Sequence, residues 1–288
     1  METTKEERYI QSIEWMHEYP GSTIEPEICV DQFASHGAEI FILGKPVDWK
    51  KYHTSNSGLL ELLKRNHMEK LYVPTSNTFT GMIGDINGFN EELLTFGVKI
   101  MSGCLTDGLK IPVGSAALIL TADCPTIVYH EIKNDVLIVA HAGLGSVVDL
   151  PYITTAIPSR SHEGVVDGIM LQTKNSEDYE IFISCGVGYK SFIYDPNHPV
   201  YGKKNKKILK YLIGAYGEQT VPLGYEHGGI SIKDVIKQQF LEYGLDPNKI
   251  HFDEIDTYND SRFWSHSRYF KQELGYCGRN GVLVLNKK

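Results

Sequence analysis

The 288-residue sequence predicts a single α/β domain in which helices flank a mixed β-sheet core. Strand-like segments rich in Ile, Val and Leu alternate with segments whose apolar residues recur at helical spacing. These segments extend along the chain, and no Pro-, Gly- or Ser-rich linker and no repeat divides them. The composition, with 42% hydrophobic and 22% charged residues, excludes a disordered chain. We therefore expect residues 1–288 to form one domain, with residues 1–30 as an N-terminal helical extension.

Short apolar runs bounded by turn residues predict the strands, at 39–44, 70–74, 116–129, 136–141, 180–186 and 281–286. Apolar residues three and four positions apart predict the helices, at 57–67, 206–216 and 231–243. Ser231 followed by Asp234 resembles a capping box, and Gly244 stands where the last of these helices should end.

The segments 116–129 and 136–141 are separated by a polar turn, which predicts an antiparallel hairpin. A two-residue turn at 133–134 would place His141 opposite Thr126 and on the same face as Cys124. A three-residue loop would place His141 on the other face, so the register is left open. Pro125 lacks a ladder donor and should mark an edge, a bulge or the end of the strand.

Charge and cysteine content exclude several classes of protein. The net charge of −8, from 28 basic and 36 acidic residues, argues against non-specific nucleic-acid binding, and the one basic run, 203–207, should be a solvated helix end. The longest apolar run, around 136–142, is far shorter than the roughly 20 residues that a bilayer requires. The first residues lack a signal-peptide pattern, and five scattered cysteines indicate a reducing compartment. We expect a cytoplasmic protein that binds neither nucleic acid nor membrane.

Cys124 and His141 are the first candidates for chemistry, because a thiol and an imidazole can act as nucleophile and base or as two zinc ligands. The alternative is a buried core thiol and a hydrogen-bonded core imidazole. Asp123 is a third catalytic candidate, and otherwise a hydrogen-bond acceptor that holds the strand end in shape. Gly143 permits a turn or the close approach of a ligand.

Several short motifs occur in order along the chain: Thr-Asp-Gly at 106–108, Thr-Ala-Asp-Cys-Pro at 121–125, His-Ala-Gly at 141–143, Ser-Cys-Gly-Val-Gly at 184–188, Thr-Tyr at 257–258, Arg-Phe-Trp-Ser at 262–265 and Gly-Arg at 278–279. Together they resemble the YfiH-like laccase-domain family, also called multicopper polyphenol oxidoreductase-like proteins and purine nucleoside phosphorylases. The resemblance extends from about residue 33 to residue 285. It implies that family's fold, and a Cys124–His141 pocket that acts on a purine nucleoside or a related small molecule.

The sequence also departs from the family's pattern. Thr80 stands where the family has the histidine that completes a His-Cys-His cluster, and His36 stands where it has an early arginine. The Trp and Arg that follow His-Ala-Gly in the family are Leu144 and Gly145 here, which should make the rim of the pocket smaller and more apolar. We count Thr80, His36 and Gly143 among the candidate substrate-binding residues.

These departures leave the expected zinc site incomplete. A catalytic zinc normally has three protein ligands, and Cys124 and His141 supply two unless His36, His266 or Asp123 is recruited. We expect zinc to bind weakly or not at all, with no other cofactor. Copper chemistry is not supported, because the sequence has no His-x-His pair.

The remaining basic residues that we expect to bind substrate are Arg279, which lies in a family motif, and Arg268; the alternative for both is a surface ion pair.

Three functions stay open. The first is an enzyme of purine nucleosides or nucleoside-like compounds, with at most weak phosphorylase activity. The second is a degraded relative that binds a nucleotide-like small molecule without turnover. The third is a metal-free Cys–His thiol hydrolase.

Overall fold

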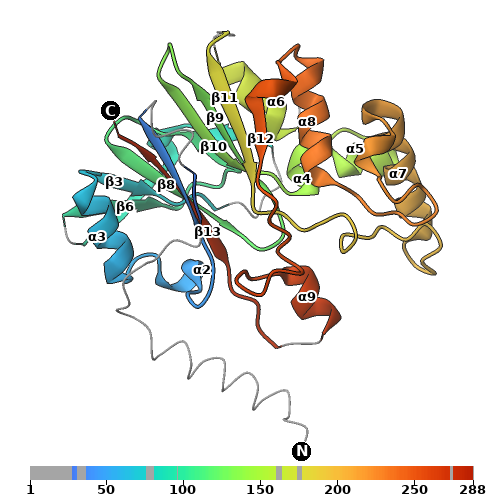
Figure 1. The fold of residues 1–288 in the computed structure, drawn as a ribbon, viewed down its shortest axis with the longest axis horizontal. Helices are drawn as coiled ribbons and strands as arrows, with labels where there is room; N and C mark the ends of the chain where they lie inside the picture. The colour runs from blue at the N-terminus through green and yellow to red at the C-terminus, as the bar shows by residue number, and fades with distance from the viewer. Residues whose placement is uncertain are drawn as a thin grey trace, which may run out of the picture.

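The computed structural model describes residues 28–30, 37–75, 81–95, 97–159, 164–173, 177–272 and 275–287. Within these ranges two mixed β-sheets pack against each other, and helices cover their outer faces (Figure 1). The predicted class, a mixed α/β fold flanked by helices, is confirmed, although the strands divide between two sheets. No helix in the described ranges is both long and apolar enough to cross a membrane.

The first sheet has seven described strands in the order β1-β2-β13-β8-β3-β6-β5. Strand β3 pairs in parallel with β6 and β8, and the other pairs are antiparallel. The strands are β1 (Ile28–Val30), β2 (Ala38–Leu43), β3 (Lys70–Tyr72), β5 (Asn90–Thr95), β6 (Val98–Ser102), β8 (Ser115–Thr121) and β13 (Asn280–Asn286).

The second sheet has six described strands in the order β12-β11-β9-β10-β7-β4. Its central strands β11, β9, β10 and β7 are antiparallel to one another, and the edge strands β12 and β4 add in parallel. The strands are β4 (Ile83–Gly84), β7 (Gly108–Lys110), β9 (Thr126–Glu131), β10 (Val136–His141), β11 (Tyr179–Ser184) and β12 (Ile250–Phe252).

Helices α2 and α3 lie on the side of the first sheet, whereas α4 to α8 lie on the side of the second (Figure 1). The α-helices are α2 (Trp49–Tyr52), α3 (Ser57–Arg65), α4 (Leu144–Val147), α5 (Leu150–Thr155), α6 (Val165–Gln172), α7 (Gly202–Tyr216), α8 (Ile232–Glu242) and α9 (His266–Lys271). The 3-10 turns are η2 (Ile86–Gly88), η3 (Glu218–Thr220) and η4 (Pro247–Lys249).

Side-chain alternation along the strands explains the layering. In β2, Ile40 and Ile42 face the second sheet, whereas Phe41 and Leu43 face α3. In β10, Val139 points toward the first sheet, and its neighbours point toward the helices. Both sheets are therefore apolar on two faces, which is why their sequences read as continuous hydrophobic runs.

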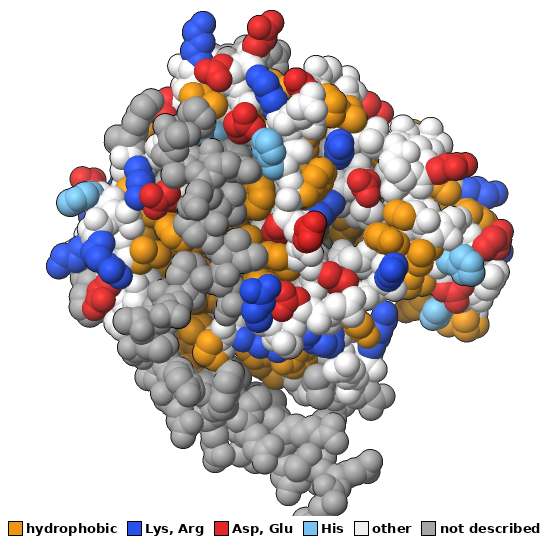
Figure 2. All heavy atoms as spheres, viewed as in Figure 1, with side chains coloured by type: hydrophobic (Ala, Val, Ile, Leu, Met, Phe, Trp, Pro, Cys, Tyr) orange, Lys and Arg blue, Asp and Glu red, His pale blue; other side chains and the backbone are white. Residues whose placement is uncertain are grey.

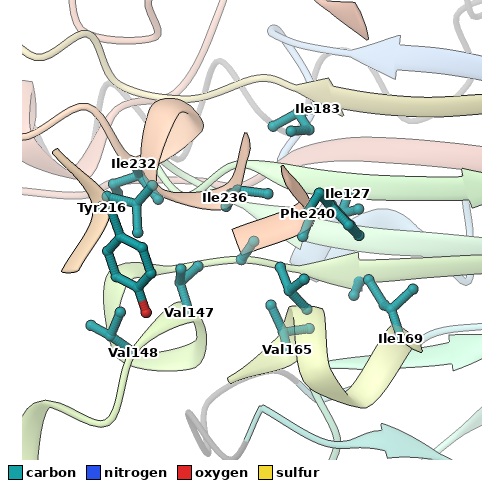
Figure 3. Close-up of a cluster of buried hydrophobic side chains, with 14 of the residues drawn as sticks. Ile127, Val147, Val148, Val165, Ile169, Ile183, Tyr216, Ile232, Ile236 and Phe240 are labelled. Atoms are coloured by element: carbon teal, nitrogen blue, oxygen red, sulfur yellow. The ribbon is translucent and has the colours of Figure 1, made fainter. Parts of the chain in front are cut away.

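The helices cover the second sheet through one large apolar cluster, shown in Figure 3. Ile127 and Ile183 from the sheet meet Val165 and Ile169 of α6 and Phe240 of α8 there. All five side chains are buried, and burial of each such side chain contributes roughly 1.5–3 kcal/mol. This cluster fixes the outer face of β9 and β10, the strands next to Cys124 and His141.

The predicted strand 116–129 is wrong as one element. Strand β8 ends at Thr121 in the first sheet, and β9 begins at Thr126 in the second. Between them Asp123 has a positive φ of 88°, and Pro125 cannot donate to a ladder. These two residues break the pairing, so the segment 122–125 is the crossover between the sheets.

Predictions that depend on residues close together in the sequence are confirmed. Strands β9 and β10 pair with His141 opposite Thr126, the register of the two-residue turn. The hydroxyl of Ser231 accepts a hydrogen bond from the Asp234 N–H at 3.4 Å, and Gly244, with φ 78°, follows α8. The lysines at 203–207 are exposed on α7, as expected of a solvated helix end. Of the expected extension 1–30, residues 28–30 form β1 and the rest lies outside the described residues.

Candidate functional site

Cys124 lies in the crossover between the two sheets and is partly exposed. The hydroxyl of Thr121, the last residue of β8, donates a hydrogen bond to the Cys124 carbonyl at 2.5 Å. The carbonyl of the next residue, Pro125, accepts a hydrogen bond from the Ala142 N–H at 2.8 Å, next to His141. The backbone therefore holds the thiol-bearing segment against the end of β10.

His141 is the last residue of β10 and is buried. It lies beside Asp107, because its backbone N–H donates to the Asp107 carbonyl at 2.7 Å. The side chains also meet, with His141 Nδ1 3.6 Å from Asp107 Oδ1. The other carboxylate oxygen of Asp107 accepts a hydrogen bond from the Gly81 N–H at 2.7 Å, so this fully buried side chain is fixed in place.

The environment of His141 shows that Cys124 is its neighbour. Burial lowers the pKa of the His141 imidazole, but the nearby charges of Cys124 and Asp107 outweigh burial and raise that pKa to about 9. The imidazole is therefore protonated at neutral pH. A thiol, an imidazole and a carboxylate are thus neighbours, and we call these three residues the Cys124 group (Cys124, His141 and Asp107).

Asp123 anchors the crossover. Its carboxylate accepts a hydrogen bond from the Thr257 hydroxyl at 2.7 Å and from the Ser267 N–H at 2.5 Å. Its carbonyl accepts a hydrogen bond from the Val187 N–H at 2.8 Å. Asp123 thus accepts hydrogen bonds that hold the strand end in shape, which is the alternative to a catalytic role. Its catalytic role stays a prediction.

The two candidate arginines donate to backbone carbonyls. Arg268 donates to the carbonyls of Tyr258, Asp260 and Phe263 at 3.1, 3.2 and 2.5 Å, and so holds the loop that precedes α9. Arg279 donates to the carbonyls of Cys277 and Gly278 at 3.2 and 3.1 Å. A substrate contact of either arginine stays a prediction.

The other candidates are dispersed. Gly143 is the N-cap of α4, with φ −64°, a conformation open to any residue. Leu144 was expected at the rim of the pocket, which is wrong, because α4 turns it into the apolar cluster under the helices. His266 is exposed at the start of α9, where its ring stacks on Phe270. His36 and Thr80 lie outside the described residues.

Among the residues that the structure describes, no group of three or more His, Cys, Asp and Glu side chains is placed to hold a metal ion. Cys124 and His141 supply two donors, short of the three protein ligands that a catalytic zinc usually has. A copper centre with several histidines does not fit these residues either. The described side chains therefore offer thiol, imidazole and carboxylate chemistry.

Two residues of the site were not among the sequence candidates. Asp107 lies in the Thr-Asp-Gly motif, and an acidic residue directly before a buried strand was a signal that could have identified it. Tyr194, in the loop between β11 and α7, lies near the thiol, because burial and then the charge of Cys124 raise the pKa of its hydroxyl. No motif marks Tyr194, so only the fold could reveal it.

Two packed mixed sheets, with a Cys–His–Asp group at their crossover, define an α/β protein with a candidate thiol–imidazole site. A family model described as multi-copper polyphenol oxidoreductase laccase matches residues 101–287, well over half of the chain. The chain belongs to this family. A search of curated proteins finds no match.

Solved structures agree on the fold. A hypothetical protein YfiH of Bacillus licheniformis matches with a TM-score of 0.57 and 13% identity, over 92% of this chain and 97% of that chain. YlmD of Geobacillus stearothermophilus matches with a TM-score of 0.60 and 14% identity, over 88% and 93%. A Neisseria meningitidis protein described under the family name DUF152 matches with a TM-score of 0.61 and 10% identity, over 91% and 99%. At such identities the likeness concerns the fold alone.

Proposed function

We propose that this protein is an enzyme that acts on a purine nucleoside or a nucleoside-like small molecule at the Cys124 group. One observation carries the proposal: the buried His141 imidazole has both Cys124 and the Asp107 carboxylate as neighbours, and its pKa is raised to about 9. Strongly perturbed titratable groups beside a specific charged partner are typical of functional sites. The substrate class comes from the family resemblance of the motifs around Cys124 and His141.

The Cys124 group suits a reaction that needs a proton donor. At neutral pH the His141 imidazole carries a proton, and Asp107 stabilises that charged form. When the bond between a sugar and a purine breaks, the departing base takes up a proton, which a positioned imidazolium can supply. In this proposal Cys124, which is a neighbour of the same ring and is partly exposed, contacts the substrate.

The first experiment measures release of the base from adenosine, inosine and guanosine, with and without inorganic phosphate. We expect His141→Gln, which removes the proton donor, to reduce base release by about 100-fold or more, the low end of what general acid–base residues contribute, and Cys124→Ala to reduce it through loss of its contact with the substrate. Cys104→Ala is the matched control, because Cys104 is also a partly exposed free thiol but lies beside Gly88. Base release that survives Cys124→Ala would contradict the proposal, and nucleoside binding without turnover would favour the degraded, ligand-binding alternative.

A second candidate function is metal-free thiol hydrolysis. A cysteine, a histidine and an aspartate that lie beside one another are the residue types that serve as nucleophile, base and orienting group in thiol enzymes. A panel of p-nitrophenyl esters tests it. Burst kinetics that Cys124→Ala abolishes, together with no nucleoside cleavage, would favour this function over the first.

The metal content should be measured on the same purified protein. We propose that the purified protein binds zinc weakly or not at all, on the ligand count of Cys124 and His141. Elemental analysis, with nucleoside cleavage measured before and after dialysis against a chelator, checks this. Stoichiometric zinc, and cleavage that returns only when zinc is added back, would show that residues outside the described ranges complete the ligand set.

A further inference from the structure

A cleft lined by tyrosines opens on the helix-covered face of the second sheet. Its described lining comes from β9, α6, β11, the end of α8 and η4, and consists of Tyr129, Met170, Glu177, Tyr179, Tyr243, Gly244, Leu245, Asp246 and Lys249. We call it the tyrosine cleft. Its volume of about 590 Å³ lies within the range of small-molecule sites, roughly 300–1,000 Å³.

The tyrosine cleft is separate from the Cys124 group. Strand β9 begins at Thr126, beside Cys124, and ends at Glu131, which pairs with Tyr179 of β11. At the rise of a β-strand these two ends of β9 are roughly 16 Å apart. Figure 1 draws α6, α8, β11 and β12 in the upper part of the view and α9 in the lower part. The tyrosine cleft is therefore a second place at which a ligand can bind.

The inner part of the tyrosine cleft is aromatic and apolar. Tyr129 and Tyr179 are buried, and their rings stack with their centres 6.0 Å apart and their planes 9° from parallel. Met170 of α6 is buried in the same apolar cluster, and the partly buried Leu245 packs against it. This surface suits a flat apolar group, because aromatic rings prefer offset-stacked or edge-to-face contacts with another ring.

Hydrogen bonds hold the tyrosines in position. The Tyr179 hydroxyl accepts a hydrogen bond from the Asp246 N–H at 2.6 Å, which ties β11 to the turn η4. The Tyr243 hydroxyl donates to the Asp167 carboxylate at 2.6 Å, which ties the end of α8 to α6. Contacts within the protein therefore shape the walls of the cleft before a ligand binds, as in most small-molecule sites.

The charges along the tyrosine cleft favour a positive ligand. Glu177 and Asp246 are exposed acidic residues, and Lys249 is the one basic residue of the described lining. The C-terminus of α8, which carries partial negative charge, also reaches the cleft at Tyr243 and Gly244. Figure 2 shows acidic and basic side chains mixed over the upper part of the visible face, so a preference for one sign has to come from the lining itself.

Lys249 shows how an ammonium group fits the tyrosines. Its Nζ lies 4.8 Å from the centre of the Tyr179 ring and donates a hydrogen bond to the Glu177 carbonyl. An ammonium group over an aromatic face is attracted by the ring's electrons. The protein's own cation therefore already makes, in the cleft, the kind of contact that a cationic ligand would make.

We propose that the tyrosine cleft binds a small organic cation in which an aromatic ring carries a protonated amine. The ring of the ligand packs on the tyrosines, and the Glu177 carboxylate holds the ammonium group at the rim. An anionic ligand would meet Glu177, Asp246 and the carbonyl end of α8, which repel it. The proposal does not depend on the nucleoside activity of the Cys124 group.

The test is isothermal titration calorimetry at constant ionic strength with three indoles of similar shape and different charge. Tryptamine is a cation at neutral pH, tryptophol is neutral and indole-3-acetate is an anion. We expect tryptamine to bind about 10-fold more tightly than tryptophol, because a charge-assisted hydrogen bond exceeds a neutral one by about that factor. Indole-3-acetate should bind more weakly than either.

Three variants locate the binding site. Glu177→Lys reverses a charge of the cleft and should weaken tryptamine binding by about 10-fold. Glu61→Lys makes the same change at an exposed position of α3, on the first sheet, and should leave tryptamine binding unchanged. Lys249→Gln removes the ammonium group that competes for the Tyr179 ring, and should tighten tryptamine binding by about 3-fold.

Melting temperatures establish that each variant is folded, and Glu177→Gln, with an expected loss of about 3-fold, keeps the test valid if Glu177→Lys unfolds. The proposal is overturned if none of the indoles binds or if indole-3-acetate binds as tightly as tryptamine. It is also overturned if Glu61→Lys weakens tryptamine binding as much as Glu177→Lys does, or if Lys249→Gln weakens it. None of these titrations requires turnover, so their failure is distinct from failure of the nucleoside activity.

Discussion

The carboxylate of Asp123 accepts a hydrogen bond at 2.5 Å from the backbone N–H of Ser267, a residue 144 positions later in the chain. The same carboxylate accepts the hydroxyl of Thr257 at 2.7 Å. One buried acidic side chain thus joins the crossover that carries Cys124 to the helix that carries Arg268. The crossover that carries Cys124 and the start of helix α9 therefore share a structural support.

Asp123→Ala should destabilise the fold by about 2–4 kcal/mol, because it leaves two donors without their charged acceptor and places alanine at a φ of 88°. Asp123→Asn should cost less, since asparagine tolerates positive φ. Urea unfolding measures both, with Glu61→Gln on the exposed face of α3 as the control. Equal stability of Asp123→Ala and the parent would show that this support is dispensable.

Asp107→Asn should slow alkylation of Cys124 by iodoacetamide by about 10-fold at pH 7. Asp107 helps to raise the pKa of His141, and the positive charge of the imidazolium stabilises negative charge on the sulfur that attacks iodoacetamide. Mass spectrometry of tryptic peptides resolves Cys124 from the other cysteines. Asp85→Asn, at an exposed turn, is the control. Unchanged Cys124 labelling in Asp107→Asn would remove Asp107 from the Cys124 group.

Cys277 should be alkylated slowly until the pH approaches 11. Burial raises the pKa of its thiol to about 11; Arg279 lowers it, and Asp123 and Asp48 raise it further. Arg279→Gln should therefore move the labelling curve to still higher pH. Half-maximal labelling of Cys277 near pH 8.5, the value of an ordinary thiol, would contradict the burial seen here.

The same pKa shift predicts how stability depends on pH. Between about pH 9 and pH 11 the unfolded chain loses the Cys277 proton while the folded protein keeps it, so the free energy of unfolding should fall across this window. Below pH 9 both states hold the proton and Cys277 adds no slope. Urea titrations from pH 8 to pH 11 check this, and Cys277→Ala should show a shallower decline than the parent.

Ala156→Gly should stabilise the protein by about 1 kcal/mol. Ala156 ends α5 with a φ of 61°, a left-handed conformation that costs a residue with a Cβ about 1–2 kcal/mol and costs glycine little. Its side chain is exposed, so little packing is lost. Gly244→Ala makes the opposite change after α8, where φ is 78°, and should destabilise the protein by a similar amount. Changes of the same sign in both variants would contradict this explanation.

Much of the local structure was determined by the sequence. The apolar period of helix α8, its Ser231 cap and Gly244 act within a few residues of one another, and the structure has all three. The turn at 133–134 likewise sets the register that brings His141 opposite Thr126. Such features depend on neighbouring backbone groups, which a sequence displays directly. Motifs also located Cys124 and His141 as neighbours, because the hairpin between them is short.

Only the tertiary structure decided which strands belong to the same sheet and which distant side chains meet. The run 116–129 reads as one strand, yet its halves belong to different sheets, because burial on both faces gives each half the same apolar character. Asp107 meets His141 through pairing of β7 with β10, and Lys45 meets the Trp264 and Tyr269 rings, which belong to a segment more than 200 residues away. Sequence patterns report the surroundings of a residue along the chain. The charge that a side chain meets across the fold is set by packing, which no local pattern contains.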